Sequence, residues 1–238
     1  MRLGLISDIH GNLAALEAVL SRLDALGVTD ILCLGDVAGY YPDLDACVDM
    51  LRQRGIRSLM GNHDDYIARG APCPRSDSAN RCLNHQRSHL RADTLAWLQD
   101  CPLRMRHGPI DCVHAGWNDP LDEYMAPSDA YFEGMEADVF ASGHTHVQYI
   151  WQGRDKVFCN PGSVGQPRDG NPRAAFAVWE DGQFTLYRAP YDIQRTQAAM
   201  AQAGFTSYFS ENLSAGTRIG GKIDAPPDLG GIETHFES

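Results

Sequence analysis

The sequence lacks the features that would place the protein in a membrane or on long nucleic acids. It contains no apolar run of the roughly 18 residues that a membrane-spanning helix needs. Its 20 Lys and Arg residues are outnumbered by 31 Asp and Glu residues, and the formal charge is -11. Binding to a long phosphate backbone depends on cationic side chains, so we expect no long nucleic acid among its partners.

Disulfide and zinc–thiolate frameworks are also missing. The 7 cysteines are scattered along the chain, and no two of them form a C-x-x-C pair. The first ten residues reach Asp8 after an apolar stretch too short for a signal peptide. These features predict reduced thiols and a cytoplasmic protein, and they leave its oligomeric state open.

The first quarter of the chain alternates between two kinds of hydrophobic pattern. Short apolar runs at 2–7, 30–36 and 56–62 predict strands. Helical spacing of apolar residues predicts helices over 12–26 and 44–54. This alternation indicates an α/β fold with a mostly parallel sheet covered by helices.

The remaining chain mixes helices with short strands and hairpins. Residues 78–100 and 192–203 have helical patterns, whereas 103–114 and 174–189 have the pattern of hairpins. Further strands are expected at 138–143, 147–151 and 156–159. We predict one domain over 1–205, followed by a Gly- and Pro-rich, partly mobile extension over 206–238.

Five polar clusters follow predicted strands directly: "SDIHGN" (7–12), "GDVAGYY" (35–41), "GNHDD" (61–65), "VHAG" (113–116) and "SGHTH" (142–146). Ligand sites of open α/β sheets form outside the carboxyl ends of strands, so these clusters should meet in space. They supply Asp8, His10, Asp36, Asn62, His63, His114, His144 and His146. This oxygen and nitrogen donor set contains no thiolate and suits Mn, Fe, Zn or Ni.

The candidate ligands are too many for one ion. Two ions about 3.5–4 Å apart, bridged by one carboxylate, would use them all. His144 and His146 are one residue apart and can each face a different ion. Asp36 stands alone at its strand end and is the natural bridge.

The ordered series D-x-H, GD, GNHD, H and GHTH resembles the calcineurin-like metallophosphoesterases over roughly residues 1–190. "GDVAGYYPD" and "NPGSVGQPRDGNPR" resemble the small bacterial phosphodiesterase branch. The resemblance implies a β-sandwich of mixed sheets flanked by helices. It implies that Asp8, His10, Asp36 and His146 hold one metal and that Asp36, Asn62, His114 and His144 hold the other, with His63 as the catalytic histidine.

We therefore expect a dinuclear metal-dependent phosphoesterase with two divalent transition-metal ions, manganese among the candidates. It would hydrolyse small or nucleotide-like esters by attack of a metal-bound hydroxide, and diesters rather than monoesters. One alternative is a non-catalytic scaffold for other proteins, since some superfamily members lack the catalytic histidine. A phosphomonoesterase or protein phosphatase is another, although Met60 stands where the protein phosphatases have an arginine.

Residues around the predicted metals are harder to assign from sequence. Arg168 suits either a phosphate clamp or a cap of its own loop. Tyr40 and Tyr41 suit packing better than stacking on a substrate base. We expect substrate specificity to reside in loops at 37–43, 64–80, 117–136 and 163–171.

Overall fold

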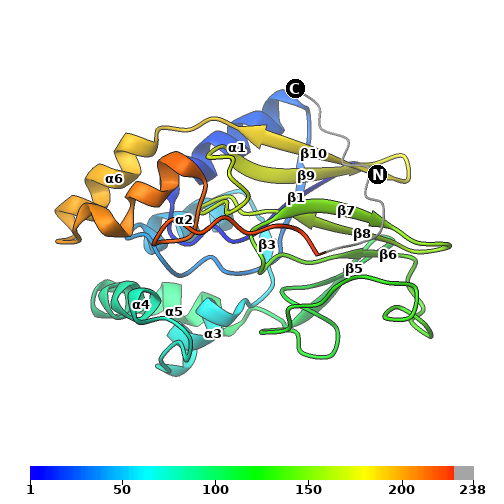
Figure 1. Cartoon of the computed structure of the whole chain (residues 1–238), viewed down its shortest axis with the longest axis horizontal. Coiled ribbons are helices and arrows are strands. Elements are labelled where there is room, and N and C mark those ends of the chain that lie inside the picture. The colour runs from blue at the N-terminus through cyan, green and yellow to red at the C-terminus, as the bar shows by residue number, and fades with distance from the viewer. Residues whose placement is uncertain (228–238) are drawn as a thin grey trace.

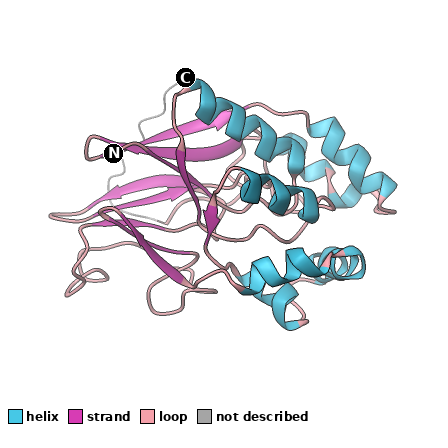
Figure 2. Ribbon diagram, turned by 180° about the vertical axis from the view of Figure 1, so that it is seen from behind, coloured by secondary structure: helices cyan, strands magenta, loops and turns pink. Residues whose placement is uncertain are grey.

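The computed structural model describes residues 1–227, which build two mixed five-stranded sheets that pack face to face. The helices gather at one end and over the outer face of the first sheet (Figure 1, Figure 2). The predicted α/β fold, a sandwich of mixed sheets flanked by helices, is confirmed.

The first sheet has the order β10-β9-β1-β2-β3. Three of its strands run parallel, namely β1 (Leu3–Ile6), β2 (Asp30–Cys33) and β3 (Arg57–Ser58). The hairpin of β9 (Ala174–Glu180) and β10 (Gln183–Ala189) adds antiparallel strands beside β1. All four residues of β1 are buried because both faces of the sheet are covered.

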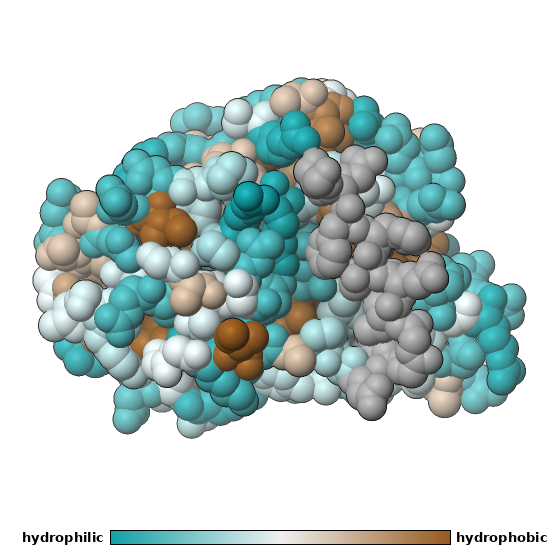
Figure 3. Space-filling model, turned by 45° about the horizontal axis from the view of Figure 1, so that its top comes forward, coloured by the Kyte–Doolittle hydropathy of each residue, from teal (hydrophilic) through white to brown (hydrophobic). Residues whose placement is uncertain are grey.

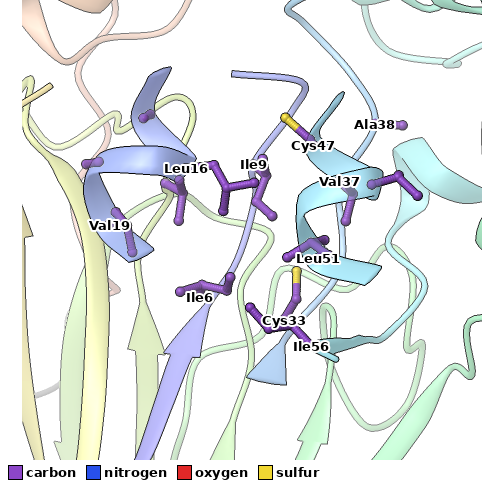
Figure 4. Close-up of a cluster of buried hydrophobic side chains, with 14 of the residues drawn as sticks. Ile6, Ile9, Leu16, Val19, Cys33, Val37, Ala38, Cys47, Leu51 and Ile56 are labelled. Carbon is purple, nitrogen blue, oxygen red and sulfur yellow. The ribbon is translucent and has the colours of Figure 1, made fainter. Parts of the chain in front are cut away.

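Helices α1 (Leu13–Ala25), α2 (Leu44–Gln53) and α6 (Ile193–Gln202) belong to the helical layer of the first sheet. Asn12 caps α1, where its side-chain oxygen accepts from the Ala15 amide. Figure 4 shows how Leu16 of α1 and Leu51 of α2 pack with Ile6 at the end of β1. This apolar layer holds the carboxyl ends of β1 and β2 next to the N-termini of α1 and α2.

The second sheet has the order β4-β5-β6-β8-β7. It comprises β4 (Arg104–His107), β5 (Ile110–Val113), β6 (Val139–Ala141), β7 (Gln148–Gln152) and β8 (Val157–Pro161). Strands β5, β6 and β8 are parallel, and their inner side chains meet those of the first sheet in a core that contains Leu5, Leu32 and Cys112. Loop residues such as Phe132 cover the other face.

The helical prediction for 78–100 and the strand prediction for 56–62 need correction. The former segment forms two helices, α4 (Asp77–His89) and α5 (Ala92–Gln99), because Leu90 between them is extended. The latter contains only the two residues of β3, and α3 (Asn62–Arg69) starts directly after its loop. Arg91 anchors the break by donating to Asp49 of α2.

The predicted extension is packed against the domain as far as the structure describes it. Two short 3₁₀ helices, η1 (Ser207–Phe209) and η2 (Glu211–Ala215), bury Phe209 and Leu213 against Tyr41 and Met200. Residues 228–238 of that extension lie outside the described part of the chain. Among residues 1–227, no helix is long and apolar enough to cross a membrane.

Candidate metal centre

All seven predicted ligands meet at the carboxyl ends of parallel strands from both sheets. Asp8 and His10 follow β1, and Asp36 follows β2. Asn62 begins α3 after β3, while the second sheet contributes the remaining residues, His114 after β5 and His144 and His146 after β6. Each of the seven side chains is buried. The sandwich thus gathers at one edge polar groups that are far apart in the sequence.

The backbone at this edge adopts a conformation that the sequence did not predict. Asp8, His10, Asp36, His144 and His146 have positive φ angles between 53° and 65°. Among the described non-glycine residues only Asp181, in the β9–β10 turn, also has a positive φ. Left-handed backbone at non-glycine residues costs about 1–3 kcal/mol each and typically clusters at functional sites. The fold therefore stabilises a strained arrangement to bring these ligands together.

The first group of donor atoms comes from Asp8, His10 and His146. Nε2 of His146 lies 3.3 Å from Asp8 Oδ1, and Nε2 of His10 lies 3.8 Å from the same oxygen. Asp8 Oδ1 is buried and has no hydrogen-bond partner in the described structure. Ligand atoms that share an ion at about 2.1 Å are roughly 3–3.5 Å apart, so this spacing fits a metal site.

The two imidazoles of this group show most clearly that a cation fits. Nδ1 of His10 lies 2.7 Å from Ala38 O, and Nδ1 of His146 lies 2.7 Å from Gln166 O. Carbonyl oxygens only accept, so both Nδ1 atoms carry the proton, and burial lowers the pKa of both rings. Their two Nε2 lone pairs then face each other at 3.0 Å. With both rings neutral this contact is repulsive, and a cation bound beside both Nε2 atoms would relieve the repulsion.

A second group of donors surrounds Asn62. Its Oδ1 lies 3.0 Å from His144 Nδ1 and 3.3 Å from His114 Nε2. Nδ1 of His114 lies 2.9 Å from Leu34 O and donates to it, so that Nε2 is the nitrogen that faces Asn62 and could bind a metal. His144 Nε2 lies 3.8 Å from a carboxylate oxygen of Asp122.

Asp36 lies between the two groups. Its Oδ2 is 3.8 Å from His10 Nε2 and 3.5 Å from His114 Nε2, whereas its Oδ1 accepts from the His63 amide. Purely by distance, the metal-capable groups are Asp8–His10–His146 and Asp8–Asp36–His114, which share Asp8. Asp8 and Asp36 each use one carboxylate oxygen to accept a backbone amide, from His144 and His63 respectively, and the free Oδ2 of Asp36 faces histidines of both groups.

The carboxylates of the centre are held in the ionised form that a metal requires. Burial alone would raise the pKa of Asp8, but the histidines around it, His146 foremost, hold it below the ordinary value. Asp36 shows the same balance, with His114 as the main histidine that lowers its pKa. In turn Asp36 outweighs the burial of His114 and raises the pKa of that imidazole to about 9.

His63 and Asp64 occupy the first turn of α3 and serve different purposes. The His63 ring lies 5.0 Å from the His10 ring, and its Nδ1 has no partner in the described structure. Burial lowers the pKa of His63 to about 4. Sequence reasoning missed Asp64, whose carboxylate accepts from the amides of Asp36 and Ala38. An acidic residue at the third position of a helix was the signal for this structural role.

A pocket of about 250 Å³ opens beside the donor atoms. His63 lines it. Each of the four loops predicted to set substrate specificity contributes one or more lining residues, among them Tyr40, Arg75, Tyr124 and Arg168. Tyr41, by contrast, is a core residue. The C-terminal segment adds Arg218 and Ile219, which sequence reasoning missed.

The fold and the donor set together are those of the metallophosphoesterase class of proteins. The model of the calcineurin-like phosphoesterase superfamily domain matches residues 1–181, and the chain belongs to this family. The resemblance inferred from the motifs is thereby confirmed.

Individual relatives agree with this membership. A metallophosphoesterase from Sphaerobacter thermophilus is 34% identical, with a TM-score of 0.80 over 91% of this chain and 100% of that chain. The uncharacterised protein MJ0912 of Methanocaldococcus jannaschii is 29% identical over 90% of this chain and 98% of its own length. The phosphodiesterase YfcE of Escherichia coli is 28% identical over 72% of this chain and 84% of its own length.

Proposed function

We propose that the protein is a dinuclear phosphodiesterase for small or nucleotide-like esters. One ion is held by Asp8, His10, Asp36 and His146, and the other by Asp36, Asn62, His114 and His144. The position of Asp36 Oδ2 between histidines of both groups carries this proposal. The similarity to the phosphodiesterase YfcE supports the preference for diesters. Manganese, iron, zinc and nickel all suit the donor atoms.

Bound ions of this kind polarise phosphoryl oxygens and make water a nucleophile at neutral pH. The protein contributes orientation. Carbonyl oxygens of Ala38, Leu34 and Gln166 fix the ring orientations and tautomers of His10, His114 and His146. Because these rings are pre-oriented and buried, little reorganisation is needed when the substrate binds.

His63 is the proposed catalytic histidine. Its ring lines the pocket, and its amide is bonded to Asp36, so the residue that bridges the two groups also positions the turn that carries His63. With a pKa of about 4 the free imidazole is neutral at pH 7. A negatively charged phosphate in the pocket would raise this pKa and favour proton donation to the departing oxygen.

Turnover of bis(p-nitrophenyl) phosphate and p-nitrophenyl phosphate with added Mn²⁺ tests the proposal. We expect hydrolysis of both, with the higher kcat/KM for the diester, and loss of activity on chelation. A higher kcat/KM for the monoester would contradict the diester preference. No turnover of either ester by metal-loaded protein would contradict the enzymatic function and leave the scaffold alternative.

A further inference from the structure

Three arginines line the pocket beside the metal centre, and they differ in their partners. Arg75 pairs with Asp122, and Arg218 pairs with Asp224. Arg168 forms no salt bridge within the described residues. Its Nε and Nη2 donate to Gln166 Oε1 at 3.0 and 2.7 Å, and Nη2 also donates to Tyr40 Oη at 3.1 Å. Both acceptors are neutral.

The unpaired charge of Arg168 is also buried. The residue is only 6% exposed, although it lines the pocket. Burying a cation without a counter-ion is costly, and proteins normally pair such a charge. The pocket is partly open to solvent, and its walls are more polar than apolar. On the face drawn in Figure 3, hydrophilic residues predominate, with a few apolar side chains among them. An anion that enters the pocket can therefore supply the missing partner.

The position of Arg168 places this charge at the proposed reaction centre. The Arg168 backbone amide donates to His146 O, and the Arg168 charge adds to burial, the main cause of the lowered pKa of both His63 and His146. The negative charge of Asp8 also favours the Arg168 cation, but the Asp8 carboxylate belongs to a metal-capable group. Once a cation takes up the charge of Asp8, no carboxylate within residues 1–227 forms a salt bridge with Arg168.

The backbone on both sides fixes Arg168. Its amide donates to His146 O at 3.3 Å, and its carbonyl accepts from the Asp224 amide at 2.7 Å. The Gly170 amide of the same loop donates to Gly216 O at 2.9 Å, and Gly216 belongs to the C-terminal segment, residues 216–224. The C-terminal segment crosses toward the second sheet in Figure 1 and thus braces the loop that carries Arg168. Such bracing is expected of a group that must be oriented before its ligand arrives.

We propose that Arg168 is the anion-binding residue of the pocket and that its Nη1 binds a phosphoryl oxygen of the ester. This assignment rests on the proposed phosphoesterase function. A guanidinium suits the role because it is always charged and presents planar donors to phosphate. Gln166 and Tyr40 occupy Nε and Nη2, so within the described structure Nη1 is left without a hydrogen-bond partner.

Arg188 offers a matched control because it packs behind the same loop. Its guanidinium is also largely buried, but it pairs with Asp169 and donates to Gln148 and to the Arg173 carbonyl. The comparison therefore uses Arg168→Met, Arg168→Lys and Arg188→Met. Calorimetric titration of the metal-loaded proteins with inorganic phosphate measures anion binding. Thermal unfolding of the metal-free proteins measures stability, and elemental analysis verifies metal content.

We expect Arg168→Met to bind phosphate at least about tenfold more weakly at unchanged metal content, because a charged hydrogen bond is lost. Its Tm should be equal to or above that of the wild type, since a buried unpaired charge has been removed. Arg168→Lys should recover part of the phosphate affinity. Arg188→Met should have a lower Tm and bind phosphate as the wild type does, because its salt bridge is structural.

Wild-type phosphate affinity in Arg168→Met would overturn the assignment while leaving the phosphoesterase function intact. Arg168→Met could show both a lower Tm and a weaker phosphate affinity. In that case, recovered phosphate affinity in Arg168→Lys would support the assignment, and unrecovered affinity would overturn it. A wild type that neither binds phosphate nor hydrolyses esters would overturn both this assignment and the proposed function.

Discussion

At the scale of single residues, the centre combines backbone strain with tightly assigned hydrogen bonds. Five of the seven proposed ligands have a left-handed backbone. The Nδ1 atoms of three histidines bond to carbonyl oxygens. Strain of this kind persists only where the surrounding structure determines the geometry. The loss of metal affinity on substituting a ligand should therefore depend on the charge of that ligand and on the number of ions it binds.

We expect Asp36→Asn to damage the centre more than His10→Ala. Asp36 faces histidines of both groups, whereas His10 contributes one neutral nitrogen to one of them. Asp36→Asn should lose both ions, with an affinity loss beyond the roughly 10–100-fold typical of residues that only support a ligand. His10→Ala should lose one ion. Metal titration followed by elemental analysis measures this, and wild-type affinity in Asp36→Asn would exclude the bridging role.

His63→Ala should retain both ions and lose activity in a way that depends on the leaving group. General acid catalysis is typically worth about 10²–10⁴ in rate and matters most for basic leaving groups. The loss in kcat should be larger for alkyl or ribose esters than for p-nitrophenyl esters at matched metal occupancy. An equal loss on both ester classes would indicate that His63 stabilises phosphoryl charge and does not donate a proton.

Metal binding should release a proton from His114. Without metal, Asp36 raises the pKa of His114 to about 9, so the ring carries a proton at pH 7 that an ion must displace. Apparent affinity should rise about tenfold per pH unit from pH 7 and level off near pH 9. The pKa in the folded state lies above the value of about 6.5 for unfolded chains. Protonated His114 therefore stabilises the metal-free folded protein fully below about pH 6.5, and this stabilisation is lost as the pH rises to about 9 and above.

Calorimetry in buffers of different ionisation enthalpy counts the released protons. His114→Gln serves as the control and should release one proton fewer. Equal proton release by the wild type and His114→Gln at pH 7.5 would exclude this role of His114.

At the scale of elements, the turns between strands and helices set the spacing of the ligands. Gly61 precedes α3 and lies against the loop after β2. A Cβ there would be 2.0 Å from Asp36 Oδ1 and 2.4 Å from Asp36 N. The close approach of two backbones, and not a special φ angle, requires glycine at this position.

Gly61→Ala should therefore displace Asp36 and lower metal affinity at least about tenfold, as a misplaced ligand does. Gly55→Ala is the matched control, because Gly55 has a φ of 65° with no atom within 4 Å of a new Cβ. It should cost about 1–2 kcal/mol in unfolding free energy and leave metal binding unchanged. Equal metal affinities in the two variants would show that the backbone near Gly61 can accommodate a Cβ without displacing Asp36.

At the scale of the whole molecule, an acidic chain encloses a centre suited to cations. The formal charge is -11, and two carboxylates of the centre are fully buried. We expect two ions per chain in protein purified without chelator. Chelation should lower the Tm, because ions that bind only the folded state stabilise it by mass action. In Asp36→Asn the Tm should respond much less to chelator. A saturating stoichiometry of one ion would contradict the dinuclear proposal.

The sequence by itself determined which polar residues meet. The clusters at 7–12, 35–41, 61–65, 113–116 and 142–146 each follow a short apolar run. Parallel strands end at a common edge, so local pattern was sufficient to predict this convergence. Local pattern did not reveal the break at Leu90 or the start of α3, because a salt bridge of Arg91 and the contacts of Asp64 are made with distant segments.

Only the tertiary structure decided how the centre is completed. It showed that Asp36 Oδ2 faces both histidine groups, that the C-terminal segment lines the pocket, and that Arg168 alone among the pocket arginines has no carboxylate partner in the described chain. These facts depend on which atoms of distant segments lie within hydrogen-bond reach. Spacing along the chain carries no information about such distances, because packing of the two sheets and the C-terminal segment sets them.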